Sequence, residues 1–181
     1  MLRVHTTGGH APAFSHIKNI KREKMKLKFD TKKIEKWDKR FSKLAKFTAE
    51  WSKDPSSKVG AVIVNKHNGV VGLGYNGFPR GVEDSIERLE NKPKKNDIVI
   101  HAEQNALLNA GDRAKGATIY VWGKPICSSC AGLIIQSGIK RVVALNPSIE
   151  NKDSQWYRKG QLSLEMFKEA GIKVDLYKTK D

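Results

Sequence analysis

Two short segments, far apart in the sequence, place the strongest constraint on the fold. One is His101-Ala102-Glu103, and the other is Cys127-Ser128-Ser129-Cys130, which holds both cysteines of the chain. One imidazole and two thiolates make three of the four ligands of a tetrahedral zinc ion, and the fourth position stays open for water. A fold that uses these residues as ligands must bring both segments to one point.

The residue two places after the histidine indicates what such a centre would do. Glu103 is close enough in sequence to hydrogen-bond a water at the open position and to carry its protons, and a purely structural zinc site needs no such carboxylate. A lone C-x-x-C is also typical of a redox dithiol or of half a zinc knuckle. The other histidines supply no second knuckle pair, and the redox interpretation leaves His101-Ala102-Glu103 unexplained. The pattern therefore favours a hydrolytic zinc centre.

Length and composition predict one domain in a reducing compartment. The 181 residues suit a single domain with a sizeable core plus some additional sequence. No apolar run approaches the roughly 20 residues of a membrane-spanning helix, and we find no secretory signal. Two closely spaced cysteines in a lysine-rich chain do not suggest a disulfide scaffold. We expect a cytoplasmic protein whose thiols are available for metal, with no membrane partner.

The basic charge is concentrated near the N-terminus. The formal net charge is +15, and residues 1–50 hold 14 Lys/Arg against 5 Asp/Glu. We predict a basic N-terminal extension over residues 1–33, followed by one domain over 34–181. Such charge can attract nucleic acid. Because no nucleic-acid-binding motif accompanies it, we favour a solvated basic surface.

Hydrophobic spacing predicts a helix at the start of the domain. Apolar residues recur at steps of three and four and would share one helical face packed on the core. Asp54-Pro55 then ends this part of the chain, since proline forbids helix continuation. The stripe consists of Ile34, Trp37, Phe41, Leu44, Thr48 and Trp51.

The rest of the domain alternates strands and helices. Asn68-Gly69 predicts a hairpin turn between strands 59–64 and 70–75, a loop follows over 76–81, and residues 82–97 suggest an exposed connection. We expect helices over 101–110, 127–136 and 163–170, and strands over 117–122, 141–145 and 172–177. This order predicts an α/β domain with a mixed sheet.

Both metal-binding segments therefore stand where a loop enters a helix. The N–H groups at a helix N-terminus favour negative charge and stabilise thiolates. Cys127 and Cys130 are three residues apart, so one helical turn brings both sulfurs to the same metal.

At this point the chain resembles the cytidine and deoxycytidylate deaminase superfamily, and most closely its deoxycytidylate (dCMP) branch. The H-x-E and C-x-x-C segments match its zinc signature. The resemblance runs from about Ile34 to Tyr177. It is carried further by Ser52-Lys53-Asp54-Pro55, residues 59–64, residues 74–81, residues 101–106 and residues 130–140.

The resemblance implies a three-layer αβα cytidine-deaminase-like fold with a mixed central sheet, and zinc-dependent deamination of dCMP to dUMP and ammonia. It implies that His101, Cys127 and Cys130 bind Zn²⁺ and that Glu103 is the proton shuttle. Asn76 would lie near the substrate sugar, and the Ala102 backbone near the base.

The resemblance also implies partners and regulators. Family members are commonly homo-oligomers, often hexamers, with a dimer or tetramer as alternatives. Many are regulated by dCTP and dTTP with Mg²⁺, and the loop from Asn76 to Asp84 resembles the segment involved. Arg80, Arg113 and Lys140 are candidates for binding a phosphate, because a nucleotide needs fixed cations.

Three features depart from the family pattern. Ile126 is inserted where P-C-x-x-C is usual, which changes the loop path but keeps the cysteine spacing. Relatives often place a tyrosine that contacts substrate after the strand equivalent to 141–145, whereas the nearest aromatics here are Trp156 and Tyr157. The basic extension is also outside the pattern. A deaminase acting on a base in nucleic acid, or on another cytosine nucleotide or nucleoside, is therefore the alternative.

Overall fold

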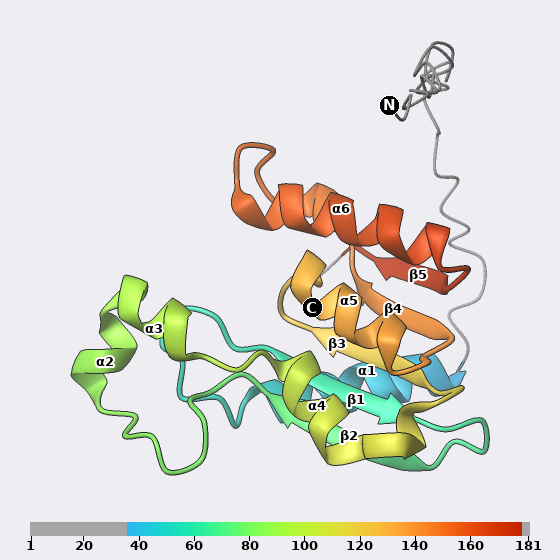
Figure 1. Cartoon of the computed structure of the whole chain (residues 1–181), viewed down its shortest axis with the longest axis horizontal. Helices are drawn as coiled ribbons and strands as arrows, with labels where there is room; N and C mark the ends of the chain where they lie inside the picture. The colour runs from blue at the N-terminus through green and yellow to red at the C-terminus, as the bar shows by residue number, and fades with distance from the viewer. Residues whose placement is uncertain (1–35, 179–181) are drawn as a thin grey trace, which may run out of the picture.

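A mixed five-stranded sheet forms the centre of the computed structural model, which describes residues 36–178 (Figure 1). The strand order is β2-β1-β3-β4-β5. β1 pairs antiparallel with both β2 and β3, whereas β3, β4 and β5 run parallel. The strands are β1 (Gly60–Val64), β2 (Val70–Tyr75), β3 (Thr118–Trp122), β4 (Arg141–Leu145) and β5 (Lys173–Tyr177). The predicted mixed sheet is confirmed.

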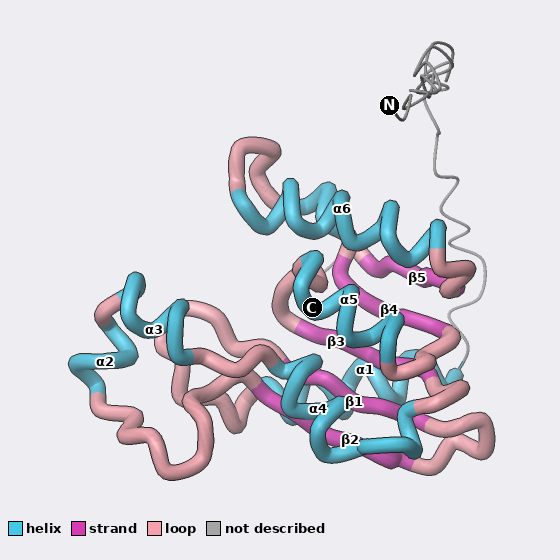
Figure 2. Tube along the Cα trace, in the orientation of Figure 1, coloured by secondary structure: helices cyan, strands magenta, loops and turns pink. Residues whose placement is uncertain are grey.

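Helices cover both faces of the sheet and give the predicted three layers. α1 (Lys36–Ala49) lies on one face, and α4 (Ala102–Ala110), α5 (Ser128–Gln136) and α6 (Gln155–Glu169) lie on the other (Figure 1). Two short helices, α2 (Ile86–Glu90) and α3 (Lys92–Ile98), project beyond one end of the sheet (Figure 2). Single 3₁₀ turns occur at η1 (Gly111–Ala114) and η2 (Pro147–Ile149). Within residues 36–178, none of these helices has the length and apolarity to cross a bilayer.

The alternation of side chains along β1 explains why the sheet needs cover on both faces. Ala61 and Ile63 pack into the core beneath α4 and α5, whereas Val62 and Val64 pack into the core beneath α1. Successive side chains of a strand point to opposite faces. β1 is fully buried along its length because both of its faces are covered.

Small residues let α4 lie directly on β2, and this contact positions the start of α4. A Cβ atom at Gly74 would lie 2.3 Å from the carbonyl oxygen of Ala102 and 2.3 Å from the amide nitrogen of Ala106. Any side chain at Gly74 would therefore push the helix away from the sheet. The sequence thus fixes where the helix that begins after His101 lies.

Three predictions about the elements were wrong in part. In α1, Phe41 and Thr48 are buried, but Trp37 and Trp51 are 44% and 48% exposed, because the stripe is wider than the surface that the sheet can cover. Residues 82–97 are not merely an exposed connection: they contain α2 and α3, and Lys95 is buried. The last helix begins at Gln155 rather than at residue 163. Ile34 and the predicted extension over 1–33 lie outside the described residues.

Candidate metal centre

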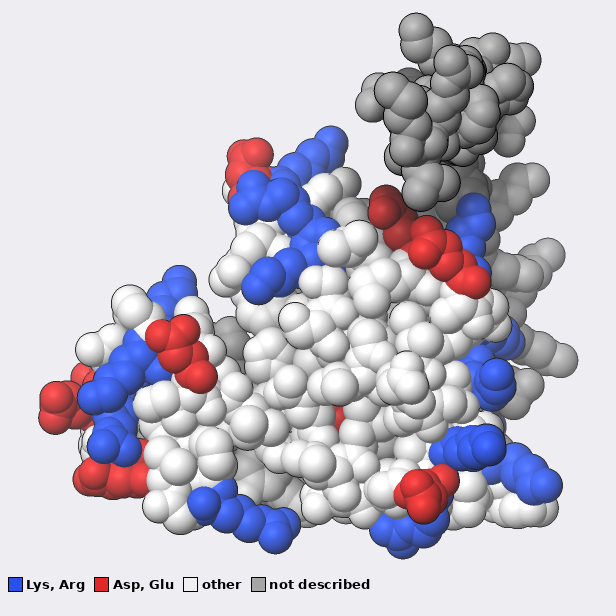
Figure 3. Space-filling model, in the orientation of Figure 1, with Lys and Arg blue, Asp and Glu red and all other residues white. Residues whose placement is uncertain are grey.

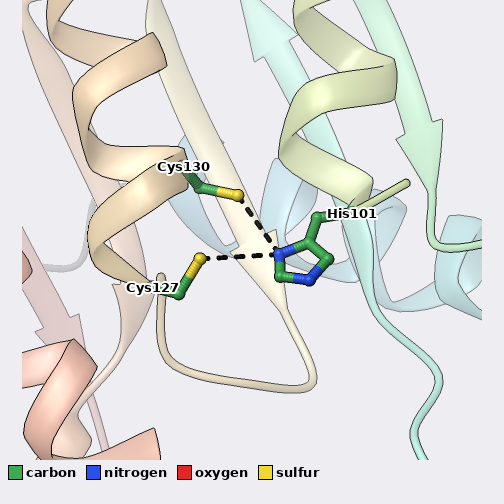
Figure 4. Close-up of side chains that lie close together, drawn as sticks. All are labelled: His101, Cys127 and Cys130. Carbon is green, nitrogen blue, oxygen red and sulfur yellow. Dashed lines mark hydrogen bonds between the residues drawn. The ribbon is translucent and has the colours of Figure 1, made fainter. Parts of the chain in front are cut away.

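His101, Cys127 and Cys130 come together at the start of two neighbouring helices. His101 is the N-cap residue of α4, and Cys127 is the N-cap residue of α5. The His101 amide donates to the side-chain oxygen of Gln104 at 2.8 Å, which fixes the first turn of α4. Figure 4 shows the three side chains pointing toward one another from these two helices. The prediction that both segments enter helices and converge is confirmed.

The spacing of the three side chains fits a zinc ion. Nδ1 of His101 lies 3.3 Å from Sγ of Cys130 and 3.5 Å from Sγ of Cys127. All three ligand atoms lie within 4.8 Å of one another. In a tetrahedral site with Zn–S near 2.3 Å and Zn–N near 2.1 Å, nitrogen and sulfur ligands lie about 3.6 Å apart. One imidazole and two buried thiols are therefore held at nearly the spacing that zinc requires.

The two thiols have opposite acidities in the metal-free protein. The hydrogen bond from Cys130 outweighs burial and, with His101 nearby, lowers the pKa of Cys127 to about 4. The same hydrogen bond and burial raise the pKa of Cys130. The hydrogen bond with Cys127 likewise raises the pKa of His101. One thiolate is thus already present at neutral pH, and a bound metal would displace the remaining proton from the pair.

Glu103 lies in the first turn of α4 and is almost completely enclosed. It is 4% exposed, and burial raises its pKa to about 7, against the opposing effect of the His101 charge. A carboxyl group whose pKa is near neutral can both accept and release a proton at physiological pH. The site therefore combines a metal-ligand set with a proton carrier in a buried position.

The comparisons with known proteins agree with this arrangement. The sequence model of the cytidine and deoxycytidylate deaminase zinc-binding region matches residues 35–146. The chain belongs to the cytidine and deoxycytidylate deaminase family. It is therefore a zinc-dependent hydrolase, and the His-Cys-Cys set is its candidate Zn²⁺ site.

Individual relatives support the family assignment over most of the chain. The chain is 45% identical to an uncharacterized deaminase in the luxG 3′ region of Aliivibrio fischeri, over 78% of this chain and 93% of that protein. It is 43% identical to the deoxycytidylate deaminase of Homo sapiens, over 65% of this chain and 68% of that protein. The dCMP deaminase of cyanophage S-TIM5, solved with dCMP and dUMP, is 24% identical and has a TM-score of 0.62, covering 77% of this chain and 95% of that one; it supports the fold.

The deaminase chain uses Asn76 to hold the loop before β1. Its side-chain oxygen accepts from the Val59 amide at 2.8 Å, and its side-chain nitrogen donates to the Ser57 carbonyl at 2.9 Å. The same nitrogen lies 3.4 Å from a carboxylate oxygen of Asp54. An amide oxygen has two lone pairs, so one remains for a further donor. Ala102, the other predicted substrate contact, is fully buried at the start of α4.

The predicted cationic contacts are scattered. Arg113 donates to the carbonyl groups of Asn109 and Ala110, so it lies at the end of α4 opposite His101. Lys140 precedes β4, at the other end of the strand from the loop that continues toward η2. Arg80 is exposed in the loop after β2. Asp84 forms an ion pair with Lys53 at 2.8 Å and lines a separate cavity. The structure does not gather these residues around the metal ligands.

Two groups near the centre were missed by sequence reasoning. Trp156, at the start of α6, has its ring centroid 6.2 Å from that of His101. Lys124, in the loop before Cys127, lies 5.7 Å from the Trp156 ring and pairs with Glu150 at 3.3 Å. Their proximity depends on where α6 begins, and no local pattern in the sequence indicates that.

A buried ion pair fastens α3 to the loop that Asn76 holds. Nζ of Lys95 lies 2.9 Å from Asp54 and 2.6 Å from the Ser56 hydroxyl. Burial opposes ionisation of Asp54, but hydrogen bonds from Lys95, Ser56 and Ser57 keep its pKa below 3.8. The segment then reaches the metal ligands directly, because Gly77 pairs with Ile100, which precedes His101.

Replacing Lys95 by Met is expected to destabilise the protein by about 3–5 kcal/mol, because the buried Asp54 carboxylate would lose its cation. The measurement is the free energy of unfolding in urea. Lys53→Met is the matched control: its pair with Asp84 is exposed, so little change is expected. Equal stability of the two variants would contradict the argument.

The same pair gives a pH dependence with a defined sign. The pKa of Asp54 is lowered on folding, so its contribution is present above the ordinary value of 3.8 and is lost as the pH falls below it. Unfolding curves of wild type and Lys95→Met are therefore expected to converge at low pH. A difference that stays constant down to the acid transition would contradict the assignment.

Proposed function

We propose that this deaminase converts dCMP to dUMP and ammonia and so supplies a precursor of dTMP. The observation that carries the proposal is the buried Glu103 carboxyl beside the converging His-Cys-Cys set. The choice of substrate rests on relatives named deoxycytidylate deaminase, including those of Homo sapiens and Mus musculus at 43% and 42% identity.

Under this proposal His101, Cys127 and Cys130 hold Zn²⁺, which when bound makes a water molecule acidic enough to attack at neutral pH. Glu103 accepts a proton from the attacking water at a carboxylate oxygen and delivers it to the ring nitrogen of cytosine. Glu103 then passes the second proton to the exocyclic amine, which leaves as ammonia. Water adds at the amine-bearing carbon and ammonia departs from it, so atoms and charge balance.

Neighbouring groups would orient the nucleotide. The free lone pair of Asn76 can accept a hydroxyl hydrogen from the sugar, while the Ala102 backbone lines the place of the base. Arg80 and Arg113 were the cations predicted for the phosphate. Arg80, exposed in the loop after Asn76, is the better supported of the two, because Arg113 caps the far end of α4.

A second candidate is a deaminase acting on a cytosine or adenosine base within nucleic acid. The net charge of +15 favours it, because lysines and arginines attract phosphates. In the described residues, however, Lys and Arg gather at the edges of the face over α4 and α5, and the middle of that face carries few charges (Figure 3). A nucleic-acid track would place cations along the approach to the metal ligands.

We further propose regulation by dCTP and dTTP with Mg²⁺, as the family resemblance implies. A cavity of about 150 Å³ beside the loop from Asn76 to Asp84 supports this, because aromatic and charged side chains line it together. The lining includes Trp51, Lys53, Asp54, Tyr75, Phe78 and Asp84. Addition of dCTP or dTTP with Mg²⁺ should change the rate of dCMP turnover, and an unchanged rate would contradict this part.

Assembly and location belong to the same proposal. We infer a homo-oligomer, a hexamer by family resemblance, and exposed Leu108 and Leu133 on α4 and α5 are apolar surface that a second copy could cover. Light scattering on the purified protein would give its mass in solution. The cytoplasm is the expected location, because both thiols must stay reduced to bind metal.

One assay tests the proposed substrate. Zinc-loaded protein is offered dCMP, dCTP, deoxycytidine, cytidine and a cytosine-containing oligonucleotide, and ammonia release is followed. We expect the highest kcat/KM with dCMP. Turnover of the oligonucleotide alone would favour the nucleic-acid candidate instead, and no turnover of any substrate with zinc bound would remove the catalytic proposal.

A further inference from the structure

One face of α6 is pressed against the loop that leads to Cys127. The Ser163 hydroxyl donates to the carbonyl of Ile126 at 2.7 Å, and Ile126 itself is buried. A Cβ atom at Gly160 would lie 2.7 Å from Pro147 and 3.2 Å from Pro125, so the helix can come this close only without a side chain there. The inserted Ile126 is thus held by α6.

The same face of α6 carries Trp156 to the metal ligands. Trp156, Gly160 and Ser163 are spaced by four and three residues, so they share one side of the helix. The Ser154 hydroxyl accepts from the Tyr157 amide at 3.1 Å and fixes the first turn. The Trp156 ring therefore lies 6.2 Å from the His101 ring, centroid to centroid, at an interplanar angle of 39°.

The Trp156 ring is only partly covered. It packs against the buried core cluster that also contains Cys127 and Cys130, but part of its surface stays accessible. Lys124 Nζ lies 5.7 Å from the ring centroid and is held there by its ion pair with Glu150. A rigid, flat, apolar surface thus stands beside the metal ligands with a cation at its edge.

Such a surface suits a planar pyrimidine. Stacking of a base on an aromatic side chain strengthens binding by roughly 10- to 100-fold, and it needs no particular hydrogen-bond pattern. We propose that Trp156 is a substrate-contacting residue whose ring forms one wall of the base-binding pocket, against which the pyrimidine of the nucleotide packs. The inference rests on the proposed function, because it takes a cytosine nucleotide as the ligand.

The test compares Trp156→Phe with Trp156→Leu. Phenylalanine keeps a stacking ring, whereas leucine keeps only apolar bulk. We expect Trp156→Leu to raise KM for dCMP roughly 10- to 100-fold with a smaller effect on kcat, and Trp156→Phe to restore most of the affinity. Trp37→Leu is the matched control, because Trp37 is exposed on α1, on the other face of the sheet. Zinc content and circular dichroism should stay unchanged in all three.

A binding measurement without turnover makes the result independent of catalysis. In the zinc-loaded Glu103→Gln protein, dCMP should quench tryptophan emission, and the quenching should disappear in the Trp156→Phe double variant. Unchanged quenching, or a Trp156→Leu enzyme with the KM of wild type, would overturn the inference. Equal losses in the Phe and Leu variants would overturn it as well, since a stacking role predicts rescue by Phe.

The outcomes for the two proposals are distinguishable. If wild-type enzyme deaminates dCMP while Trp156→Leu retains its KM, the proposed function stands and the role of Trp156 fails. If wild type turns over no dCMP, the proposed function fails, and the binding measurement still decides whether Trp156 contacts the nucleotide.

Discussion

Replacing Glu103 by Gln is expected to lower kcat/KM for dCMP by about 10²- to 10⁴-fold while the protein keeps its zinc. The amide has nearly the shape of the carboxyl group and fits the same buried position, but it cannot accept a proton from water or return one to the base. Glu103 is not among the three converging metal ligands, so metal content should stay at the wild-type level. Steady-state kinetics and metal analysis on the same preparation give both results.

The control for this variant is Glu165→Gln, which makes the same chemical change at an exposed position of α6. We expect wild-type kinetics from it. Loss of zinc from Glu103→Gln would mean that the carboxylate is a ligand or holds one in place. Activity close to wild type with zinc bound would mean that another group moves the protons.

Much of the fold could be predicted because its signals are local. Asn68-Gly69 marks the hairpin, and Asn68 does adopt a positive φ of 61° in the turn. Gly111 ends α4, also with a positive φ, of 54°. The metal site was predictable for a related reason: His101 and Cys127 each precede a helix, and the chemistry of zinc restricts which residues can converge.

The surroundings of the site were not predictable, because they depend on contacts between distant segments. Lys95 reads as one more surface lysine in a charged stretch, yet it pairs with Asp54, 41 residues earlier. Gly160 suggests a break in a helix, but it is the point at which α6 approaches Pro147 most closely. Without that approach, the start of α6 and the place of Trp156 cannot be found.

Charge gave the least guidance about function. The net charge of +15 suggested nucleic acid as a competing ligand, and the predicted cations were chosen from a chain with 34 lysines and arginines. In the fold, Arg113 caps α4 and Arg141 binds Asp38 and Asp175. Many basic side chains have structural roles of this kind, so sequence counts alone cannot identify those that bind a phosphate.

Replacing Cys130 by Ser is expected to weaken zinc binding by at least about 100-fold, and with it to abolish most turnover. Partners outside the ligand shell already contribute about 10- to 100-fold to metal affinity, and a directly bound thiolate should contribute more. Cys130 is fully buried, and the serine hydroxyl that replaces it is a poor zinc ligand. Competition with a chelator of known affinity measures the change.

Added zinc should also stabilise the wild-type protein against thermal unfolding far more than the Cys130→Ser variant, because binding to the folded state raises its stability in proportion to RT ln(1 + [Zn]/Kd). Ser129→Ala, an exposed change in the same helical turn, is the control and should behave as wild type. Glu103→Gln and Cys130→Ser then separate the two functions of the centre: the first should lose turnover and keep the zinc-dependent stability, whereas the second should lose both. A Cys130→Ser protein with wild-type zinc affinity would show that the metal is held by a different set of residues.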